Sequence, residues 1–166
     1  SDLGTTTGHA GLLVTAFALA FCIASPVIAV ATDRYDRKKV LVGGLIIFAI
    51  TNGLMVVVNS FWLALALRVI AGISASAVSP PAMAIAGGRA PSGREGKFLS
   101  IVTAGLTVAL FTGVPFGAWL GDIWSWRVTF LVIALVAAIV TVLSAVLLPY
   151  VPGNPTTSFS ERFSPL

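Results

Sequence analysis

The chain has 166 residues, of which 57% are hydrophobic and only 10% are charged, and its mean hydropathy is +1.01. A soluble domain carries about 25% charged residues, so this sequence has too few polar side chains to cover a water-facing surface. The composition therefore disfavours a soluble helical domain and favours a membrane protein. The net charge of +4 does not indicate nucleic-acid binding, because the basic residues stand mostly in loops between apolar runs.

Five apolar segments each approach the roughly 20 residues that a membrane-spanning helix needs. None of them alternates apolar with polar residues, as the strands of a membrane barrel do. The sequence therefore predicts an all-α membrane protein, a polytopic bundle of about five transmembrane helices. The predicted segments are residues 11–31, 40–58, 61–86, 99–120 and 128–148.

Basic residues are distributed unevenly among the loops. Seven lysines and arginines stand in the two loops that follow the first and third segments, between residues 34 and 97. In the other loops, Arg127 is the only basic residue before the tail. Cytoplasmic loops of membrane proteins carry an excess of lysine and arginine. We therefore expect the two basic loops to face the cytoplasm, with the N-terminus outside and the C-terminal tail inside.

The sequence also leads to predictions about the extent of the bundle and about the two ends of the chain. Residues 1–150 form the predicted helical bundle. Residues 151–166 are rich in Pro, Ser and Thr, and we expect a flexible cytoplasmic tail or the start of a linker. The chain begins Ser1-Asp2, and an odd number of spans with an external start predicts that a preceding helix is absent.

No group of residues in the sequence points to catalysis. His9 is the only histidine, and no Cys, Asp or Glu cluster surrounds it. Cys22 lies inside an apolar run without a second cysteine and is expected to be a packing residue. Acid–base or metal chemistry needs titratable groups that converge. The sequence therefore predicts no enzyme activity, no metal site and no cofactor, and a membrane-embedded enzyme is disfavoured.

Arg68 is the one charged residue inside a predicted spanning segment, seven residues past Phe61. This spacing places it about 10 Å along the helix, which approaches a third of the roughly 30 Å hydrocarbon core. A cation at the centre of a membrane helix costs at least about 2.5 kcal/mol, so it normally faces a cavity or a partner. We expect such an environment for Arg68. The alternative is that its long side chain reaches back to the outer interface.

Small residues and prolines recur within the apolar segments. Three glycines of the fourth segment stand four residues apart, at Gly113, Gly117 and Gly121. Such a stripe lets two helices approach closely in a membrane, and Pro115 within it should kink the helix. The stripe predicts either plain tight packing or a kinked helix that moves against its neighbour. Pro80 and Pro81 should bend or end the third segment.

The first basic loop resembles a signature of the major facilitator superfamily, which reads Gly-x-Leu-Ala-Asp-Arg-x-Gly-Arg-Lys. The matching residues are Asp33, Arg34, Arg37 and Lys38. At two positions Ala29 and Asp36 stand in place of glycine. The second departure affects the expected tight turn, because aspartate adopts a positive φ less readily than glycine does.

Three further patterns resemble the same family. Arg68 followed by Gly72 is similar to a pattern of the fourth helix, although Ala71 replaces the usual glutamine. The run that contains Gly105, Gly113, Pro115, Gly117 and Gly121 resembles the fifth-helix signature of drug:proton antiporters. Residues 126–130, Trp-Arg-Val-Thr-Phe, resemble the segment that follows it. The resemblance covers about residues 11–148, which correspond to the second through sixth helices of the family.

The resemblance implies part of the N-terminal half of a multi-pass transporter of the inner membrane, without the first helix and the C-terminal half. It looks closest to sugar-efflux and chloramphenicol-resistance-like members, which export small molecules by alternating access, driven by proton entry. The implied partners are a substrate, protons, membrane lipid and the absent helices. The implied cytoplasmic latch consists of Asp33, Arg34, Arg37 and Lys38. Arg68 would assist proton coupling or substrate binding. The alternative is a truncated membrane remnant that transports nothing.

Overall fold

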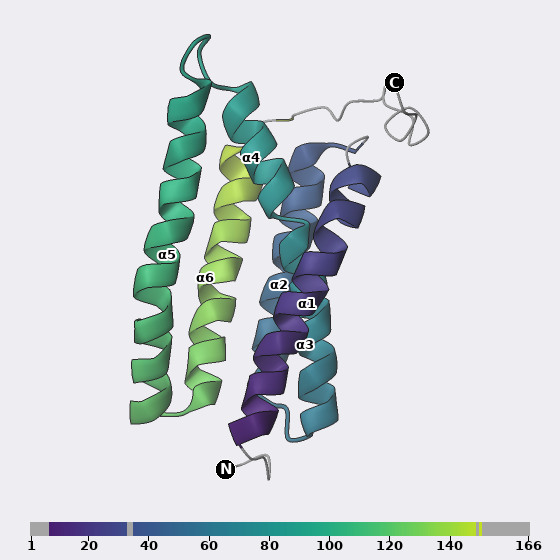
Figure 1. The fold of residues 1–166 in the computed structure, drawn as a ribbon, viewed down its shortest axis with the longest axis vertical. Coiled ribbons are helices and arrows are strands. Elements are labelled where there is room, and N and C mark those ends of the chain that lie inside the picture. The colour runs from purple at the N-terminus through teal and green to yellow at the C-terminus, as the bar shows by residue number, and fades with distance from the viewer. Residues whose placement is uncertain (1–6, 33–34, 149, 151–166) are drawn as a thin grey trace.

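The computed structural model describes residues 7–32, 35–148 and 150, and the regular structure in them is entirely helical. The elements (Figure 1) are α1 (Thr7–Thr32), α2 (Arg37–Met55), α3 (Phe61–Ser76), α4 (Ser79–Gly88), α5 (Glu95–Ile123) and α6 (Trp126–Leu147). Five spans, with α3 and α4 joined into one, are long and apolar enough to cross a membrane. The predicted all-helical bundle of five spans is thus confirmed. The predicted tail, 151–166, and the loop residues Asp33 and Arg34 lie outside the described residues.

The third predicted segment is interrupted between α3 and α4. The interruption falls at Ala77 and Val78, just before the two prolines. Pro80 and Pro81 stand in the first turn of α4, where the N–H groups have no partner within the helix and proline costs little. The predicted bend or end at these prolines is therefore confirmed. In contrast, α5 continues as one helix across Pro115, and the kink expected there stays a prediction.

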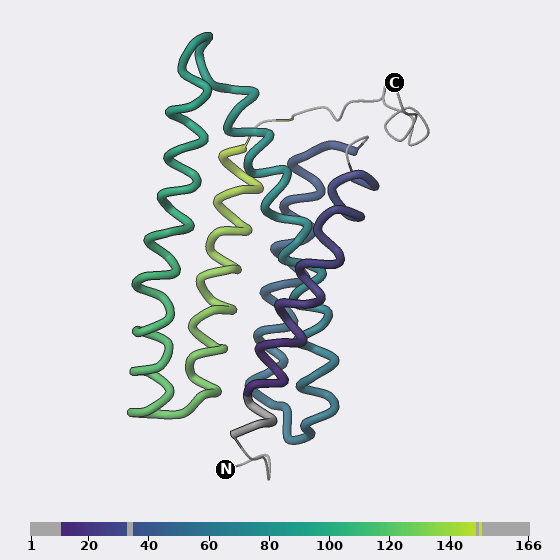
Figure 2. The backbone as a smooth tube through the Cα atoms, viewed as in Figure 1, coloured from purple at the N-terminus to yellow at the C-terminus, as the bar shows by residue number. Residues whose placement is uncertain are grey.

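The helices run side by side along the long axis of the molecule (Figures 1 and 2), with α6 between α2 and α5 and with α1 against α3. The helix α5 has no buried residue, and neither does α1 over residues 11–32. These two helices therefore form outer faces of the bundle, whereas α2 and α3 supply most of the core.

The core consists of two apolar clusters, one toward each end of α2. The first contains Met55, Val58, Ala64 and Leu67, packed against Leu13, Trp126 and Phe130. The second contains Leu41, Leu45 and Ile85, packed against Val42, Val78, Ala82 and Leu148. Gly44, which lies on α2 between Leu41 and Leu45 of the second cluster, is so close to α3 that an added Cβ would stand 3.0 Å from the carbonyl oxygen of Ser74. Close approach at this glycine lets α2 pack on α3 along its length.

Arg127 links the start of α6 to the end of α2 through two hydrogen bonds. Its Nη1 donates a hydrogen bond of 2.6 Å to the carbonyl oxygen of Val56, and its Nη2 donates one of 2.7 Å to Oδ1 of Asn59. The last carbonyls of a helix have no partner within it, so the guanidinium satisfies one of them from a neighbouring helix. The basic residue that stands apart from the two basic loops therefore has a structural role.

Both basic loops lie at the same end of the bundle. The start of α2, which carries Arg37, Lys38 and Lys39, is at the upper end of Figure 1, together with the connection between α4 and α5. The α2–α3 and α5–α6 connections lie at the opposite end. The alternation of loops that the charge pattern predicts is therefore present in the fold. We call the end with the two basic loops the basic end.

Candidate functional site

The guanidinium of Arg68 on α3 is held by a side chain of α2. Its Nη2 donates a hydrogen bond of 2.8 Å to Oδ1 of Asn52. Asn52 is only 1% exposed, and its Nδ2 donates in turn to the carbonyl oxygen of Phe48 at 2.7 Å. Because the amide is fixed through its own helix, its oxygen is oriented toward Arg68. The half-buried arginine thus has the partner that its position in an apolar segment requires.

Two aromatic rings flank the same guanidinium. The Cζ atom of Arg68 lies 4.5 Å from the ring centroid of Phe130 on α6 and 5.6 Å from that of Phe17 on α1. A cation within about 6 Å of a ring centroid is attracted by the negative face of the ring, and more strongly where water is excluded. Helices α1, α2, α3 and α6 therefore all contribute to the surroundings of this one charge. We call Arg68, Asn52, Phe17 and Phe130 the arginine cluster.

The arginine cluster leaves hydrogen-bonding capacity unused. A guanidinium has five N–H donors, and Arg68 uses one of them for Asn52. Its Nε is buried and has no acceptor among the described residues. A buried donor without a partner lowers the stability of the fold by about 1–3 kcal/mol. Such a loss is unusual for a charged side chain whose role is packing alone.

Gly72 lies one turn after Arg68 on α3 and sets the distance to α1. A Cβ added there would stand 2.5 Å from the carbonyl oxygen of Phe17 and 3.1 Å from the backbone nitrogen of Phe21. Both atoms belong to the backbone of α1 and cannot turn aside as a side chain can. Glycine at this position therefore allows the close contact of α1 with α3, and it brings the ring of Phe17 beside the guanidinium.

The first basic loop, which the structure describes from Tyr35 onward, leads directly into α2. Asp36 is the N-cap of the helix, and its Oδ1 accepts a hydrogen bond of 3.0 Å from the backbone N–H of Lys38. Its φ is −57°, so this position does not need the positive φ that favours glycine. The concern that aspartate would disturb a tight turn is thus removed, since the carboxylate instead satisfies a free N–H of the first turn.

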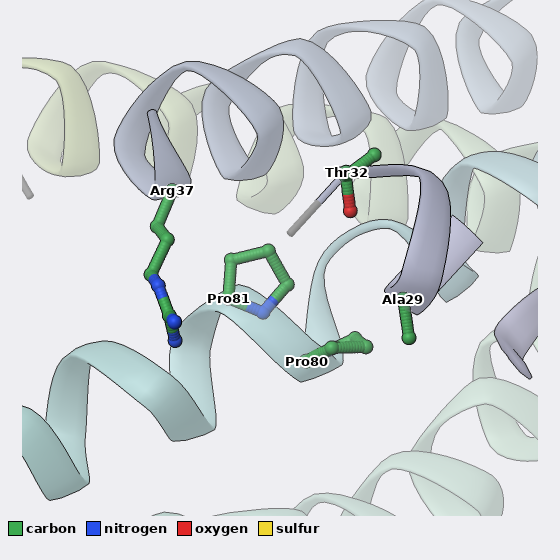
Figure 3. A pocket seen from close by; sticks show the side chains of 5 residues that line it. All are labelled: Ala29, Thr32, Arg37, Pro80 and Pro81. Carbon is green, nitrogen blue, oxygen red and sulfur yellow. The ribbon is translucent and has the colours of Figure 1, made fainter. Parts of the chain in front are cut away.

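Arg37 reaches from the start of α2 toward α4. It borders a small cavity of about 40 Å³ at the basic end, which is also lined by Ala29 and Thr32 of α1 and by Pro80 and Pro81 of α4 (Figure 3). In Figure 3 the guanidinium lies beside the first turns of α4, next to Pro81. The side chain therefore stands where α1, α2 and α4 meet, and the cavity is too small for a drug-sized molecule.

The glycines of α5 differ in their surroundings. A Cβ at Gly117 would stand 3.3 Å from Cγ2 of Thr129 on α6, and one at Gly121 would stand 3.7 Å from Oγ1 of the same threonine. Thr129 also donates a hydrogen bond of 3.1 Å to the carbonyl oxygen of Gly117. At Gly105 and Gly113 an added Cβ would meet nothing within 4 Å. Part of the stripe thus faces α6, and the rest faces outward from the described residues.

The family model of the Major Facilitator Superfamily matches residues 1–164. The chain belongs to the major facilitator superfamily. It is 34% identical over 134 residues to the chloramphenicol resistance protein of Streptomyces lividans, an alignment that covers 81% of this chain and 34% of that protein. It is 33% identical over 162 residues to the uncharacterized MFS-type transporter YbcL of Bacillus subtilis (strain 168), covering 98% of this chain and 42% of that one.

A third superfamily relative is the quinolone resistance protein NorA of Staphylococcus aureus (strain MRSA252). It is 29% identical over 164 residues, which cover 99% of this chain and 42% of NorA. The chain thus spans about two-fifths or less of the length of the curated relatives it matches. As a member of this superfamily it is an integral membrane protein.

The sequence pointed to Arg68 and Gly72 in this superfamily member but not to their partners. Asn52, Phe17 and Phe130 stand 16, 51 and 62 residues from Arg68, on other helices. An asparagine in an apolar segment is a weak signal for an interhelical hydrogen bond, and it could have drawn attention to Asn52. The two phenylalanines carry no such signal. No group of three or more His, Cys, Asp or Glu residues that could hold a metal occurs in the described part of the chain.

Proposed function

We propose that this chain is part of a proton-coupled exporter of small molecules, such as drugs or sugars, located in the cell (inner) membrane. Two relatives that support this proposal are named for resistance to chloramphenicol and to quinolones, and both drug classes are small molecules with aromatic parts. Superfamily transporters work by alternating access between two repeats. The substrate, the protons and the remaining helices, namely a first helix and a C-terminal half, are the partners that the proposal requires.

The observation that carries the proposal is the arginine cluster. A cation in the interior of a membrane segment is expensive and in general marks a pathway for substrates or ions. Here the charge is partnered by the neutral Asn52 and by two rings, and no carboxylate neutralises it among the described residues. A positive charge in this setting can respond to an acidic group that gains or loses a proton. We therefore assign to Arg68 a role in proton coupling or substrate binding.

The basic end and α5 have supporting roles in the proposal. Arg37 lies where α1, α2 and α4 meet, and with Asp33, Arg34 and Lys38 it would form a cytoplasmic latch against the other half. The outward face of α5 is strongly apolar, with Phe111 79% and Val114 68% exposed. That face suits either lipid or further helices of the transporter, and the unhindered Gly113 would allow close approach of such a helix.

A reconstitution experiment tests the proposed function. The full-length protein that carries this sequence is placed in liposomes, and uptake or release of chloramphenicol, norfloxacin and ethidium is followed with an imposed pH gradient. The proposal predicts movement of at least one compound that stops when a protonophore collapses the gradient. Transport that is unaffected by the gradient would reject proton coupling. Absence of any movement of the three compounds by well-folded full-length protein would contradict the proposed export of such molecules.

A further inference from the structure

A groove opens at the basic end between the start of α2 and the end of α6, away from the arginine cluster. It has a volume of about 440 Å³. Its lining residues are Asp36, Lys38, Lys39, Val42, Gly43, Ile46, Ala145 and Tyr150. The first six residues come from the first turns of α2, and the other two come from the end of α6 and just beyond it. The groove is much larger than the cavity beside Arg37.

The groove is charged at one end and apolar along its length. Lys38 and Lys39 stand in the first turn of α2, whereas Ile46 is seven residues further along the helix, about 10 Å at 1.5 Å per residue. The walls between them are Val42 and Gly43. A Cβ added at Gly43 would meet nothing within 4 Å, so the absence of a side chain there leaves space open. A ligand that fills this groove needs a polar head and an apolar body.

The head of such a ligand should be anionic. The two lysines and the one aspartate of the lining leave one net positive charge. The carboxylate of Asp36 already accepts the backbone N–H of Lys38 as the helix cap. Neither lysine side chain donates a hydrogen bond to another described residue. Among the described residues, no acceptor therefore competes with an anion for the two ammonium groups, which stand at the level where the helix leaves the membrane.

We propose that this groove binds an anionic phospholipid of the cytoplasmic leaflet, with its phosphate at Lys38 and Lys39 and an acyl chain along Val42, Gly43 and Ile46. Basic sites between transmembrane helices on the cytoplasmic side suit anionic headgroups. The position of Tyr150 at the rim, 66% exposed, fits the enrichment of tyrosine at the membrane interface. The lipid would bridge the start of α2 and the end of α6, beside the packing of Leu148 against the second apolar cluster.

Two other occupants are conceivable and serve as outcomes of the test. The chain continues beyond Tyr150, so its own residues 151–166 could enter the groove. These residues contain one glutamate and one arginine, a neutral balance that offers the lysines little complementarity. A free phosphate compound shares the anionic chemistry of the lipid head but has nothing to place along the apolar wall.

Lipid binding is measured on the full-length purified protein in mild detergent. Phosphatidylglycerol and phosphatidylcholine with the same acyl chains are titrated, and bound lipid is counted by native mass spectrometry alongside the thermal midpoint. We expect phosphatidylglycerol to bind and to raise the midpoint, and phosphatidylcholine to do so much less. Near an anionic surface each lysine contributes roughly a five-fold change in binding constant, so Lys38→Gln with Lys39→Gln should weaken binding by more than about tenfold.

Two further variants separate the groove from general charge effects. Gly43→Leu fills the open space with an apolar side chain and should reduce phosphatidylglycerol binding while both lysines remain. Lys97→Gln removes the same charge from the exposed start of α5 at the basic end, and binding should stay within twofold of wild type. Equal losses in the Lys97 variant and in the double lysine variant would contradict a specific site.

Two results identify a different occupant and would overturn the proposal. Glycerol 3-phosphate that displaces the lipid at equal concentration would show a site for phosphate alone. Phosphatidylglycerol binding that appears only after residues 151–166 are deleted would show that the tail occupies the groove. Since lipid binding is measured without transport, its failure leaves the proposed exporter function untouched.

Discussion

Arg68 and Asn52 form a hydrogen bond of 2.8 Å between the middle of α3 and the last turns of α2. Each residue also has a second contact: Asn52 donates to the carbonyl oxygen of Phe48, and two aromatic rings lie within 6 Å of the Arg68 guanidinium. Interhelical hydrogen bonds between neutral groups in membranes are worth only about 0.6 kcal/mol on average. The hydrogen bond between Arg68 and Asn52 is therefore more important for fixing the position of the half-buried charge than for its own contribution to stability.

Replacement of Asn52 should destabilise the bundle because it leaves Arg68 without an acceptor. Asn52→Ala is expected to lower the free energy of unfolding in detergent by about 1–2 kcal/mol. Thr51→Val is a matched control, since the Thr51 hydroxyl bonds only to carbonyls of its own helix. In a double-mutant cycle, Arg68→Met should cancel part of the Asn52→Ala cost. Additive costs would show that the hydrogen bond contributes nothing.

Gly72 and Gly43 allow a second comparison, because both are helical glycines but only Gly72 lies against a neighbouring helix. Gly72→Ala would place a Cβ 2.5 Å from a backbone oxygen of α1, so α1 must move, at a cost of about 1–3 kcal/mol. Gly43→Ala meets nothing and should be neutral or slightly stabilising, because alanine favours the helix. Thermal unfolding in detergent measures both. A Gly72→Ala protein as stable as wild type would contradict the close contact of α1 with α3.

The membrane-spanning helices of this fold could be predicted from the sequence, because the bilayer requires a certain length and an apolar composition of each span. The predicted start at Phe61 and the interruption near Pro80 follow from such local rules. The extent of α5 was underestimated. It begins at Glu95 rather than Leu99 and ends at Ile123 rather than Leu120, because a helix continues into the interface with polar and small residues that carry no hydropathy signal.

The residues that contact Arg68 in the candidate site could not be predicted from the sequence in the same way. The cost of burying Arg68 predicted that a partner or a cavity exists, but Asn52, Phe17 and Phe130 are placed by the packing of four helices. The same holds for Gly44, whose contact with Ser74 depends on the crossing of α2 and α3. The expected role of Asp33 and Arg34 cannot be compared with the fold, because they lie outside the described residues.

The α5 glycines should differ in their tolerance of a large side chain. Gly117→Leu would crowd Thr129 and disturb its hydrogen bond to the carbonyl oxygen of residue 117, so we expect α5 to separate from α6, with lower thermal stability. Gly113→Leu meets no described residue and should lower that stability less, because the contact of α5 with α6 stays intact. Detergent melting of the two variants decides this. Equal behaviour of both would remove the α6 contact as the reason for glycine at position 117.

Labelling of single cysteines tests the orientation of the bundle. In a Cys22→Ala background, cysteine is placed at Ser60 in the α2–α3 connection and at Ser92 in the α4–α5 connection, both of which are exposed. Ser60 is preferred to its neighbour Asn59, which accepts a hydrogen bond from Arg127. A membrane-impermeant maleimide added to intact cells should label position 60 and spare position 92. The opposite pattern would reverse the assigned topology.

The transport rate of an Arg68→Gln variant, relative to the amount of folded protein, tests most directly that the arginine cluster serves transport. Glutamine keeps hydrogen-bonding groups for Asn52 but lacks the charge that the rings of Phe17 and Phe130 flank. In liposomes with an imposed pH gradient, we expect drug transport to fall by at least about tenfold, the scale of about 1.4 kcal/mol of lost interaction. Lys97→Gln serves as the charge control and should transport at the wild-type rate. Wild-type transport by Arg68→Gln, at equal folded protein, would contradict the account and leave the half-buried arginine with a role in packing only.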